Sequence, residues 1–150
     1  MSEIRSPLLS IVVPVHKLVG RDQNIRRWIE EISETGIEVI LVLDKPDAQT
    51  NKIVEDLIFS NSNILFKRRE VNFGNPGGTR NVGLEIATGQ WVVFWDSDDV
   101  GIPNLLLKIL RGINSESEVI VGEALIKKDN QKEIVLGNSV KDTIFNPGIW

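Results

Sequence analysis

The 150-residue chain contains no cysteine, one histidine and no apolar run long enough to span a membrane. The absence of cysteine excludes disulfides and thiolate metal sites. The amino terminus lacks the basic start and long apolar core of a secretion signal. Positive charge is also scarce: the net charge of −4 argues against nucleic acid as a partner. We therefore expect a cytoplasmic protein, with peripheral membrane association as the alternative.

Composition and periodicity describe one ordinary α/β domain. Hydrophobic residues make up 41% of the chain and charged residues 25%, as in typical globular proteins. Apolar runs predict strands at residues 8–15, 37–43, 63–66, 91–95 and 118–126. Apolar residues at helical spacing, together with helix-start and helix-end signals, predict helices at 22–35, 47–60, 79–87 and 103–112. A turn at 127–132 and a returning antiparallel strand at 133–136 complete the pattern. This alternation indicates βαβ units with a mostly parallel central sheet in a single domain over residues 1–150.

Residues 90–99 are the most informative segment, because five apolar residues run directly into Asp96, Asp98 and Asp99. The apolar run predicts a strand buried on both faces of a parallel sheet. Alternation along an extended chain would place Asp96 and Asp98 on one side and Asp99 on the other. Open parallel sheets bind ligands beyond the carboxyl ends of their strands. We interpret the cluster as an open site for a divalent ion whose other ligands are phosphate oxygens and water.

Two other interpretations of the acidic cluster compete with a metal–phosphate site. Asp and Ser suit helix starts, so the segment could be a solvated capping turn before Pro103. A calcium loop does not fit, because Val100 and Leu107 stand where calcium ligands belong. The capping turn therefore stays open as the alternative.

Two further predicted strands end in polar residues. The first strand ends in Pro14 and Val15 and is followed by His16, and the second ends beside Asp44. In a doubly wound sheet these ends meet in one crevice with the acidic cluster. We therefore expect the three strand ends to form one site.

The chain resembles the inverting glycosyltransferases of family 2, which have the fold called GT-A. The resemblance rests on residues 10–15 and 39–44 of the first two strands and on two linked blocks, residues 72–84 and 94–99. An Arg-Asn-x-Gly segment, then Ala-x-Gly, then an apolar strand closing on Asp-Ser-Asp-Asp is a specific combination. The resemblance covers nearly the whole chain.

The resemblance implies a Rossmann-like, three-layer α/β/α sandwich whose mostly parallel sheet has an antiparallel C-terminal portion. It implies an enzyme of polysaccharide biosynthesis. Such an enzyme transfers a sugar from a nucleoside-diphosphate sugar, usually a UDP-sugar, to a hydroxyl acceptor with inversion. Magnesium or manganese would be the cofactor, and the acceptor would be a saccharide or a lipid-linked molecule.

The resemblance also implies a role for each acid of the cluster. Asp98 matches the metal-binding carboxylate of the family's Asp-x-Asp motif. Asp96 and Asp99 would orient the ion or hold hydroxyls of the ribose and the sugar. Asp96 and Asp98 are thus expected to bind both the metal and the nucleotide-sugar.

The remaining nucleotide-sugar residues implied by the resemblance are Pro14, His16, Asp44 and Arg80. Asp44 would lie near the nucleoside base, His16 would stand where an aromatic residue is usual, and Arg80 would face the site. Three of these residues also have a simpler interpretation: His16 as a hydrogen-bonding residue at a strand end, Asp44 as a turn former and Arg80 as a surface helix residue.

The chain departs from the family pattern in three places. The second-strand motif continues as Lys45-Pro46-Asp47 in place of another Asp, a Gly and a Ser, and Lys17 stands where an Asn is usual. The family's general base is an acid in a later segment, before which this chain ends. We therefore expect a unit truncated before the acceptor-binding segment, with no base assigned. The alternative is a non-catalytic nucleotide-sugar-binding module, and a nucleotidyltransferase is a weaker third.

Overall fold

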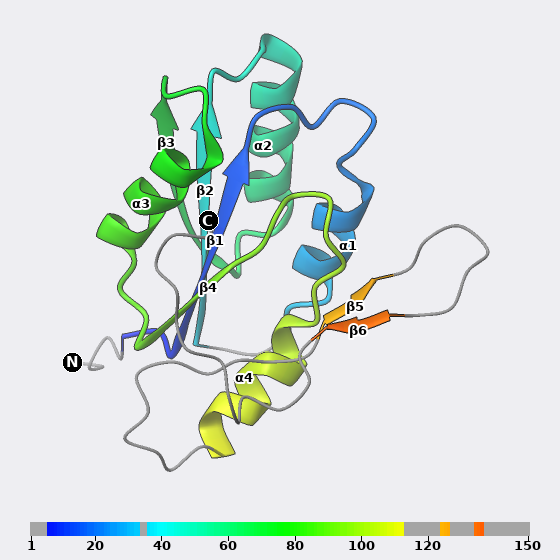
Figure 1. Cartoon of the computed structure of the whole chain (residues 1–150), viewed down its shortest axis with the longest axis vertical. Helices are drawn as coiled ribbons and strands as arrows, with labels where there is room; N and C mark the ends of the chain where they lie inside the picture. The colour runs from blue at the N-terminus through cyan, green and yellow to red at the C-terminus, as the bar shows by residue number, and fades with distance from the viewer. Residues whose placement is uncertain (1–5, 34–35, 113–123, 127–133, 137–150) are drawn as a thin grey trace. The chain divides into compact units, whose positions relative to one another are not determined.

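Figure 1 shows the chain as a computed structural model, which describes residues 6–33, 36–112, 124–126 and 134–136. The chain divides into two units, Met1–Ile113 and Asn114–Trp150. The first unit contains a four-stranded parallel sheet, and the second contains a two-stranded antiparallel sheet. In the described part of the chain, no helix has both the length and the apolar character needed to cross a bilayer.

The sheet of the first unit has the strand order β3-β2-β1-β4. Its strands are β1 (Leu9–Val15), β2 (Ile37–Asp44), β3 (Leu65–Val71) and β4 (Trp91–Phe94). In β2 all eight residues are buried, as the continuous apolar run predicts. Because every pairing is parallel, the carboxyl ends of the strands lie along one edge of the sheet.

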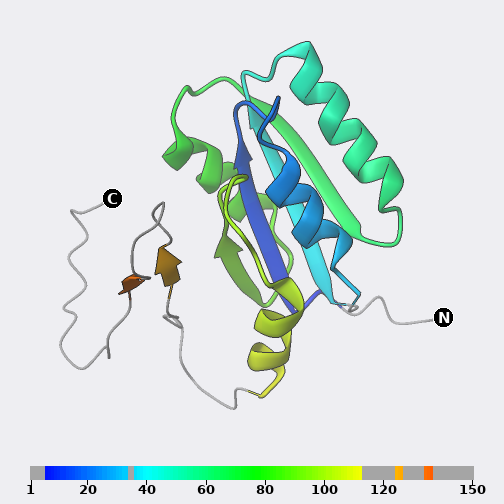
Figure 2. The same ribbon diagram turned by 90° about the vertical axis from the view of Figure 1, so that its right-hand side faces the viewer.

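Helices cover both faces of this sheet, and Figure 2 shows α3 across the sheet from α1 and α2. The helices are α1 (Gln23–Glu30), α2 (Ala48–Ser60), α3 (Pro76–Ile86) and α4 (Pro103–Gly112). Apolar residues of α1, α2 and α4 share one hydrophobic cluster with β1 and β2. On the other face, Val82 and Ile86 of α3 pack against Val12, Ile40 and Val42. The predicted three-layer arrangement is therefore confirmed.

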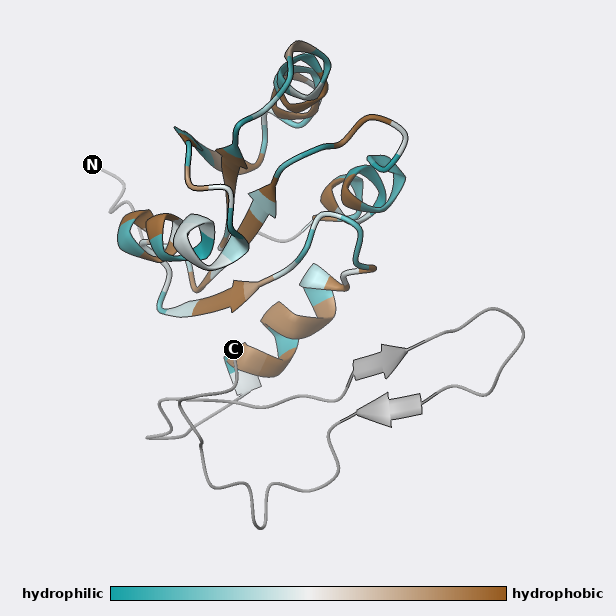
Figure 3. Cartoon of the chain, turned by 45° about the horizontal axis from the view of Figure 1, so that its top comes forward, coloured by the Kyte–Doolittle hydropathy of each residue, from teal (hydrophilic) through white to brown (hydrophobic). Residues whose placement is uncertain are grey.

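Hydropathy along the elements follows this layering, with one exception. In Figure 3 the helices α1 and α2 carry both hydrophilic and hydrophobic colour, whereas α4 is mainly hydrophobic. Leu107 and Leu110 of α4 are buried in the core, but Leu105 and Ile109 are each 49% exposed. The apolar composition of α4 is thus only partly used within the first unit.

Strand β4 corrects one prediction, because it is not buried on both faces. Its residues are half-buried, and Phe94 is 43% exposed. Among the described residues β4 pairs only with β1, so it is an edge strand of this sheet. Its apolar run contributes Trp91 and Val93 to the hydrophobic cluster on one face of the sheet and Val92 to the smaller cluster on the other face.

Strand β3 corrects a second prediction, which placed a short strand at 63–66. The strand runs over Leu65–Val71, so Lys67, Arg68 and Arg69 lie inside it. β3 is the other edge strand of the sheet, and charged side chains on an edge strand can reach solvent while its backbone stays paired with β2.

Two helix boundaries also differ from the sequence pattern. Helix α1 ends at Glu30, before the predicted end at residue 35. Just beyond this end, the Asn104 side chain binds the backbone: it donates to the Glu31 carbonyl and accepts from the Ser33 N–H. Helix α3 begins at Pro76, three residues before the predicted start. The Asn75 side chain accepts a 2.7 Å hydrogen bond from the Gly78 N–H and so caps the helix.

The second unit has one described feature, the pairing of β5 (Ala124–Ile126) with β6 (Ile134–Leu136). The pairing is antiparallel, as predicted for the C-terminal portion. Residues 118–123 of the predicted strand, the turn at 127–132 and residue 133 lie outside the described residues.

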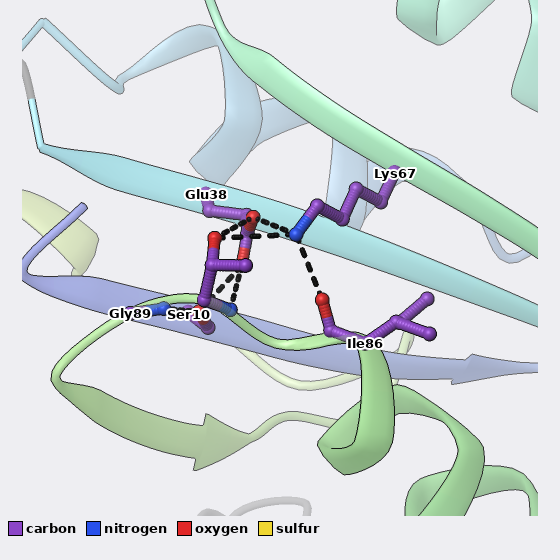
Figure 4. A network of polar contacts seen from close by, with 6 residues as sticks. Ser10, Glu38, Lys67, Ile86 and Gly89 are labelled. Atoms are coloured by element: carbon purple, nitrogen blue, oxygen red, sulfur yellow. Dashed lines mark hydrogen bonds and ion pairs between the residues drawn. The ribbon is translucent and has the colours of Figure 1, made fainter. Parts of the chain in front are cut away.

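A fully buried carboxylate, Glu38 of β2, joins three strands near the amino ends of β1 and β2 (Figure 4). It forms a 2.6 Å ion pair with Lys67 of β3 and accepts a 2.6 Å hydrogen bond from the Ser10 hydroxyl. The Thr88 N–H and hydroxyl also donate to it. Burial alone raises the pKa of Glu38, but these hydrogen bonds outweigh burial and hold the pKa below its ordinary value. Lys67 is therefore a structural partner of this buried carboxylate.

Two glycines in the motif blocks are required by close packing. A Cβ on Gly83 of α3 would lie 2.2 Å from Val12 Cγ1, so the glycine lets α3 rest directly on β1. A Cβ on Gly89 would lie 2.5 Å from the Ser10 hydroxyl oxygen. The Arg-Asn-x-Gly and Ala-x-Gly glycines thus set the distance between α3, the following connection and the sheet.

Candidate functional site

A pocket of about 360 Å³ lies where β1, β2 and β4 end. Four segments line it: the end of β1 with the stretch after it, the last residue of β2, the first turns of α3 with the loop before it, and the acidic segment after β4. The lining residues are Pro14, Val15, His16, Lys17, Arg21, Asp44, Gly74, Asn75, Pro76, Thr79, Arg80, Asp96, Ser97 and Asp98. The structure thus brings together all six residues predicted for the nucleotide-sugar site. Their binding roles stay predictions.

Asp44, the last residue of β2, holds the glycine-rich loop against the pocket. Its side chain is buried, and Oδ1 accepts hydrogen bonds from the N–H groups of Gly74 and Phe73 at 3.0 and 2.9 Å. The Gly74 N–H is the strongest influence that lowers the pKa of Asp44, with the Phe73 N–H adding to it against the effect of burial. Gly74 has a φ of +71°, which favours glycine. The ionised Asp44 therefore fixes the shape of this loop.

His16 is exposed at the end of β1 and held in one orientation. Its Nδ1 lies 2.8 Å from the carbonyl oxygen of Asp44. Because a carbonyl can only accept, Nδ1 donates the hydrogen bond in this contact. The hydrogen bond predicted by the simpler reading is present, and the ring still lines the pocket.

Arg80 and Asp96 form an ion pair inside the pocket, with 2.6 Å between Nη2 and Oδ1. Arg80 belongs to α3 and Asp96 follows β4. Their side chains are 33% and 49% exposed, respectively. Arg80 therefore faces the pocket, as the family resemblance implied, and compensates the charge of Asp96 in the protein alone.

The other two acids of the cluster lie in different surroundings. Asp98 is exposed and lines the pocket, and its backbone carbonyl accepts a 2.6 Å hydrogen bond from Asn24 of α1. Asp99 is outside the pocket lining, and its N–H donates to the Asp96 carbonyl at 3.0 Å, which closes a turn. Loss of solvent around it, followed by the charges of Asp96 and Asp98, raises the pKa of Asp99.

The three carboxylates predicted to hold a metal are thus not gathered into one cage. In the described ranges, no group of three or more Asp, Glu, His or Cys side chains is placed to surround an ion. Asp96 and Asp98 both face the pocket, and carboxylate oxygens are the ligands that magnesium and manganese prefer. This donor set fits an open ion site completed by phosphate and water, but not a closed protein site.

Sequence reasoning missed two cations of the pocket, Lys17 and Arg21. Both lie in the stretch between β1 and α1, beside His16. Where the structure describes the chain, the side chain of Arg21 has no hydrogen bond or ion pair. Their position in a loop at the carboxyl edge of a parallel sheet could have indicated them. The lining therefore balances three cations (Lys17, Arg21 and Arg80) against three carboxylates (Asp44, Asp96 and Asp98).

A parallel α/β sheet with a charge-lined pocket at its carboxyl edge has the architecture of the doubly wound α/β class, whose ligand sites lie at this edge. The chain belongs to the glycosyl transferase family 2, which it matches over residues 10–148. The family membership inferred from the motif blocks is confirmed.

Relatives of known name support this membership over part of their length. The chain is 41% identical over 100 residues to the poly(ribitol-phosphate) beta-N-acetylglucosaminyltransferase TarS of Staphylococcus aureus, covering 60% of this chain and 16% of TarS. It is 25% identical over 123 residues to the GalNAc(5)-diNAcBac-PP-undecaprenol beta-1,3-glucosyltransferase of Campylobacter jejuni, covering 82% and 40%. The chain therefore spans 40% or less of these two relatives.

Solved structures confirm the fold. TarS 1-349 of S. aureus in complex with UDP superposes with a TM-score of 0.58 at 29% identity, covering 69% of this chain and 31% of the TarS 1-349 chain. The mannosyltransferase PcManGT of Pyrobaculum calidifontis, in complex with GDP-Man and Mn2+, superposes with a TM-score of 0.61 at 16% identity, covering 75% and 34%. Both are GT-A glycosyltransferases, so the predicted GT-A fold is confirmed.

Proposed function

We propose that this chain is the donor-binding part of a glycosyltransferase that transfers a sugar from a nucleoside-diphosphate sugar to a hydroxyl acceptor with inversion. The observation that carries the proposal is the single pocket at the ends of β1, β2 and β4, which joins His16, Asp44, Arg80 and Asp98. UDP is the nucleotide we favour, because the family member TarS binds it.

Two groups of pocket residues would contact two different parts of the donor, the nucleoside and the diphosphate. His16 and the loop held by Asp44 would contact the nucleoside, with the His16 ring fixed by its bond to the Asp44 carbonyl. Lys17 and Arg21 would attract the diphosphate through their charge. The amino terminus of α3 also lies at the pocket, where its positive dipole end favours an anion. These groups orient the donor without any covalent step.

Magnesium or manganese would be held by Asp98 and Asp96 together with phosphate oxygens of the donor. When bound, such an ion stabilises the negative charge that develops on the leaving diphosphate. The two carboxylates need no further protein ligand, since a divalent ion in a phosphate site commonly uses one or two. Asp99, outside the pocket lining, would support the turn that presents Asp96.

The acceptor is proposed to be a saccharide or a lipid-linked molecule. The relatives are named for transfer to poly(ribitol-phosphate) and to an undecaprenol-linked oligosaccharide. An acceptor of the second kind would bring the protein to a membrane surface from the cytoplasmic side. That location is part of the proposal.

A nucleotide-sugar-binding module without turnover is the second candidate. The contacts of the pocket carboxylates support it. Inverting transfer needs a base for the acceptor proton. Of the three pocket carboxylates, Asp44 is bound to the loop and Asp96 to Arg80. Only Asp98 has no side-chain partner among the described residues, and it is assigned to the ion. The pocket can therefore hold the donor, but none of its carboxylates is assigned as the base that takes the acceptor proton.

Donor turnover separates the two candidates. The protein would be incubated with a panel of UDP-sugars and manganese, and release of UDP would be followed by chromatography alongside calorimetric binding of UDP. An enzyme is expected to bind UDP and release it from one donor faster than buffer does. Binding without release would identify the module, and absence of UDP binding would contradict both candidates.

A further inference from the structure

The ion pair between Arg80 and Asp96 occupies a carboxylate that the proposed function assigns to a metal. Of the ion pairs formed by the described residues, this is the one whose two partners both line the pocket. The 2.6 Å distance places a guanidinium nitrogen directly on Asp96 Oδ1. A divalent ion that binds Asp96 through this oxygen competes with Arg80 for it and brings a second positive charge next to the guanidinium.

The pair is built on rigid elements that meet at one residue of β1. Helix α3, which carries Arg80, rests on Val12 through Gly83. The residue before Asp96, Trp95, donates its N–H to the Val12 carbonyl at 3.0 Å. The two charged side chains are therefore brought together by the core of the sheet, unlike a pair between two mobile surface chains.

The charges of the pocket determine what can replace Arg80. The lining side chains carry three positive and three negative charges. A bare divalent ion would make the pocket strongly positive and would leave the Arg80 guanidinium beside a dication. A diphosphate that arrives with the ion supplies the missing negative charge and gives Arg80 a new partner. Charge balance therefore opposes the ion alone and favours the ion together with the diphosphate.

We propose that Arg80 occupies the metal ligand Asp96 in the empty pocket and leaves it when an ion and a diphosphate bind together. Arg80 is thus a positioning residue that makes the pocket selective for the metal–diphosphate complex over free metal. This inference rests on the proposed function, because it takes Asp96 as a ligand of the ion. It adds a coupling between the two ligands that has a defined sign.

Manganese binding by itself tests this coupling. Free Mn2+ would be titrated into the protein without nucleotide and followed by electron paramagnetic resonance, and the titration would be repeated with UDP present. Arg80→Met should bind Mn2+ alone about fivefold or more tightly than the wild type, since typical coupling factors between ligands start at this size. The same variant should bind UDP with Mn2+ more weakly. Arg80→Lys keeps the charge, and its affinity for Mn2+ alone should lie between those of the wild type and Arg80→Met.

Matched variants separate this effect from a general change in charge. Arg26→Met removes an arginine whose carboxylate partner, Asp22, lies outside the pocket, and it should leave Mn2+ binding unchanged. In an Asp96→Asn background, Arg80→Met should no longer tighten Mn2+ binding. If Arg80→Met does not fold, Arg80→Gln provides the same comparison.

The outcomes distinguish the inference from the function on which it rests. Absence of UDP binding by the wild type with Mn2+ would remove the proposed function. UDP binding by the wild type, combined with equal or weaker Mn2+ binding in Arg80→Met, would overturn only the proposed competition between Arg80 and the ion for Asp96. Tightening of equal size in the Asp96→Asn background would also overturn it.

Discussion

Replacing Asp44 with alanine should detach the glycine-rich loop from the end of β2. In the structure the Asp44 carboxylate accepts hydrogen bonds from the Phe73 and Gly74 N–H groups at 2.9 and 3.0 Å. A hydrogen bond to a charged group contributes about 1.5 to 3 kcal/mol. The contact with the Thr79 hydroxyl, at 3.4 Å, is too long to add much. Because pocket water can replace part of what is lost, we expect a cost of about 3 kcal/mol, near the lower bound for two such bonds.

The asparagine variant makes the argument sharper, because its amide oxygen can still accept both bonds but without charge. Charge-assisted bonds are roughly twice as strong as neutral ones, so Asp44→Asn should lose about half as much as Asp44→Ala. The lowered pKa of Asp44 also predicts a pH effect. Its stabilisation is complete above the ordinary value of 3.8 and is lost as the pH falls through the lower pKa of the folded protein.

Urea unfolding would give the free-energy change, and hydrogen exchange at the Phe73 and Gly74 amides would locate it. Asp56→Ala, which removes an exposed aspartate of α2, is the matched control. The loop-holding role is refuted if these amides exchange in Asp44→Ala as slowly as in the wild type. A loss of UDP binding in Asp44→Asn, with slow exchange retained, would instead assign the carboxylate to base recognition.

Two further substitutions test the packing that supports the site. Glu38→Gln leaves Lys67 without its buried partner and should cost about 3 kcal/mol in urea unfolding, and pairing it with Lys67→Met should recover part of this loss. Because the pKa of Glu38 is lowered, its contribution is present above 4.5 and fades in more acidic solution, so a constant difference between wild type and Glu38→Gln down to acidic pH would argue against the pair. Gly83→Ala places a Cβ 2.2 Å from Val12 Cγ1 and should lower stability by about 1 to 3 kcal/mol in thermal unfolding. Gly77→Ala, in the open first turn of the same helix, should not, and equal effects of the two would contradict the close-packing argument.

The layers of the fold could be read from the sequence because they depend on local periodicity. The eight-residue run of β2 and the helical apolar stripe of α1 identify buried elements without knowledge of their neighbours. The exposure of Phe94 could not be read in this way, since it follows from the place of β4 at the edge of the sheet. The early start of α3 could have been predicted, because Asn75 followed by Pro76 is a helix-start signal.

The convergence of the site was predictable, but its charge pairing was not. Parallel topology alone places the ends of β1, β2 and β4 at one edge, which is enough to bring His16, Asp44 and Asp98 into one pocket. The bond between Arg80 and Asp96 depends on the contact of α3 with β1 through Gly83, and no local pattern contains it. Side-chain alternation does not apply to Asp96, Asp98 and Asp99, because β4 ends at Phe94 and a turn follows. Asp99 nevertheless lies outside the pocket lining that contains Asp96 and Asp98.

Calorimetric titration of UDP with manganese tests the central claim, that Asp98 and its pocket bind a divalent ion together with a diphosphate. The wild type should bind UDP with manganese and lose this binding in EDTA. Asp98→Asn should weaken it about tenfold or more, as loss of support at a metal site typically does. Asp56→Asn, outside the pocket, should bind like the wild type. UDP binding that is unchanged in EDTA and in Asp98→Asn would contradict the account.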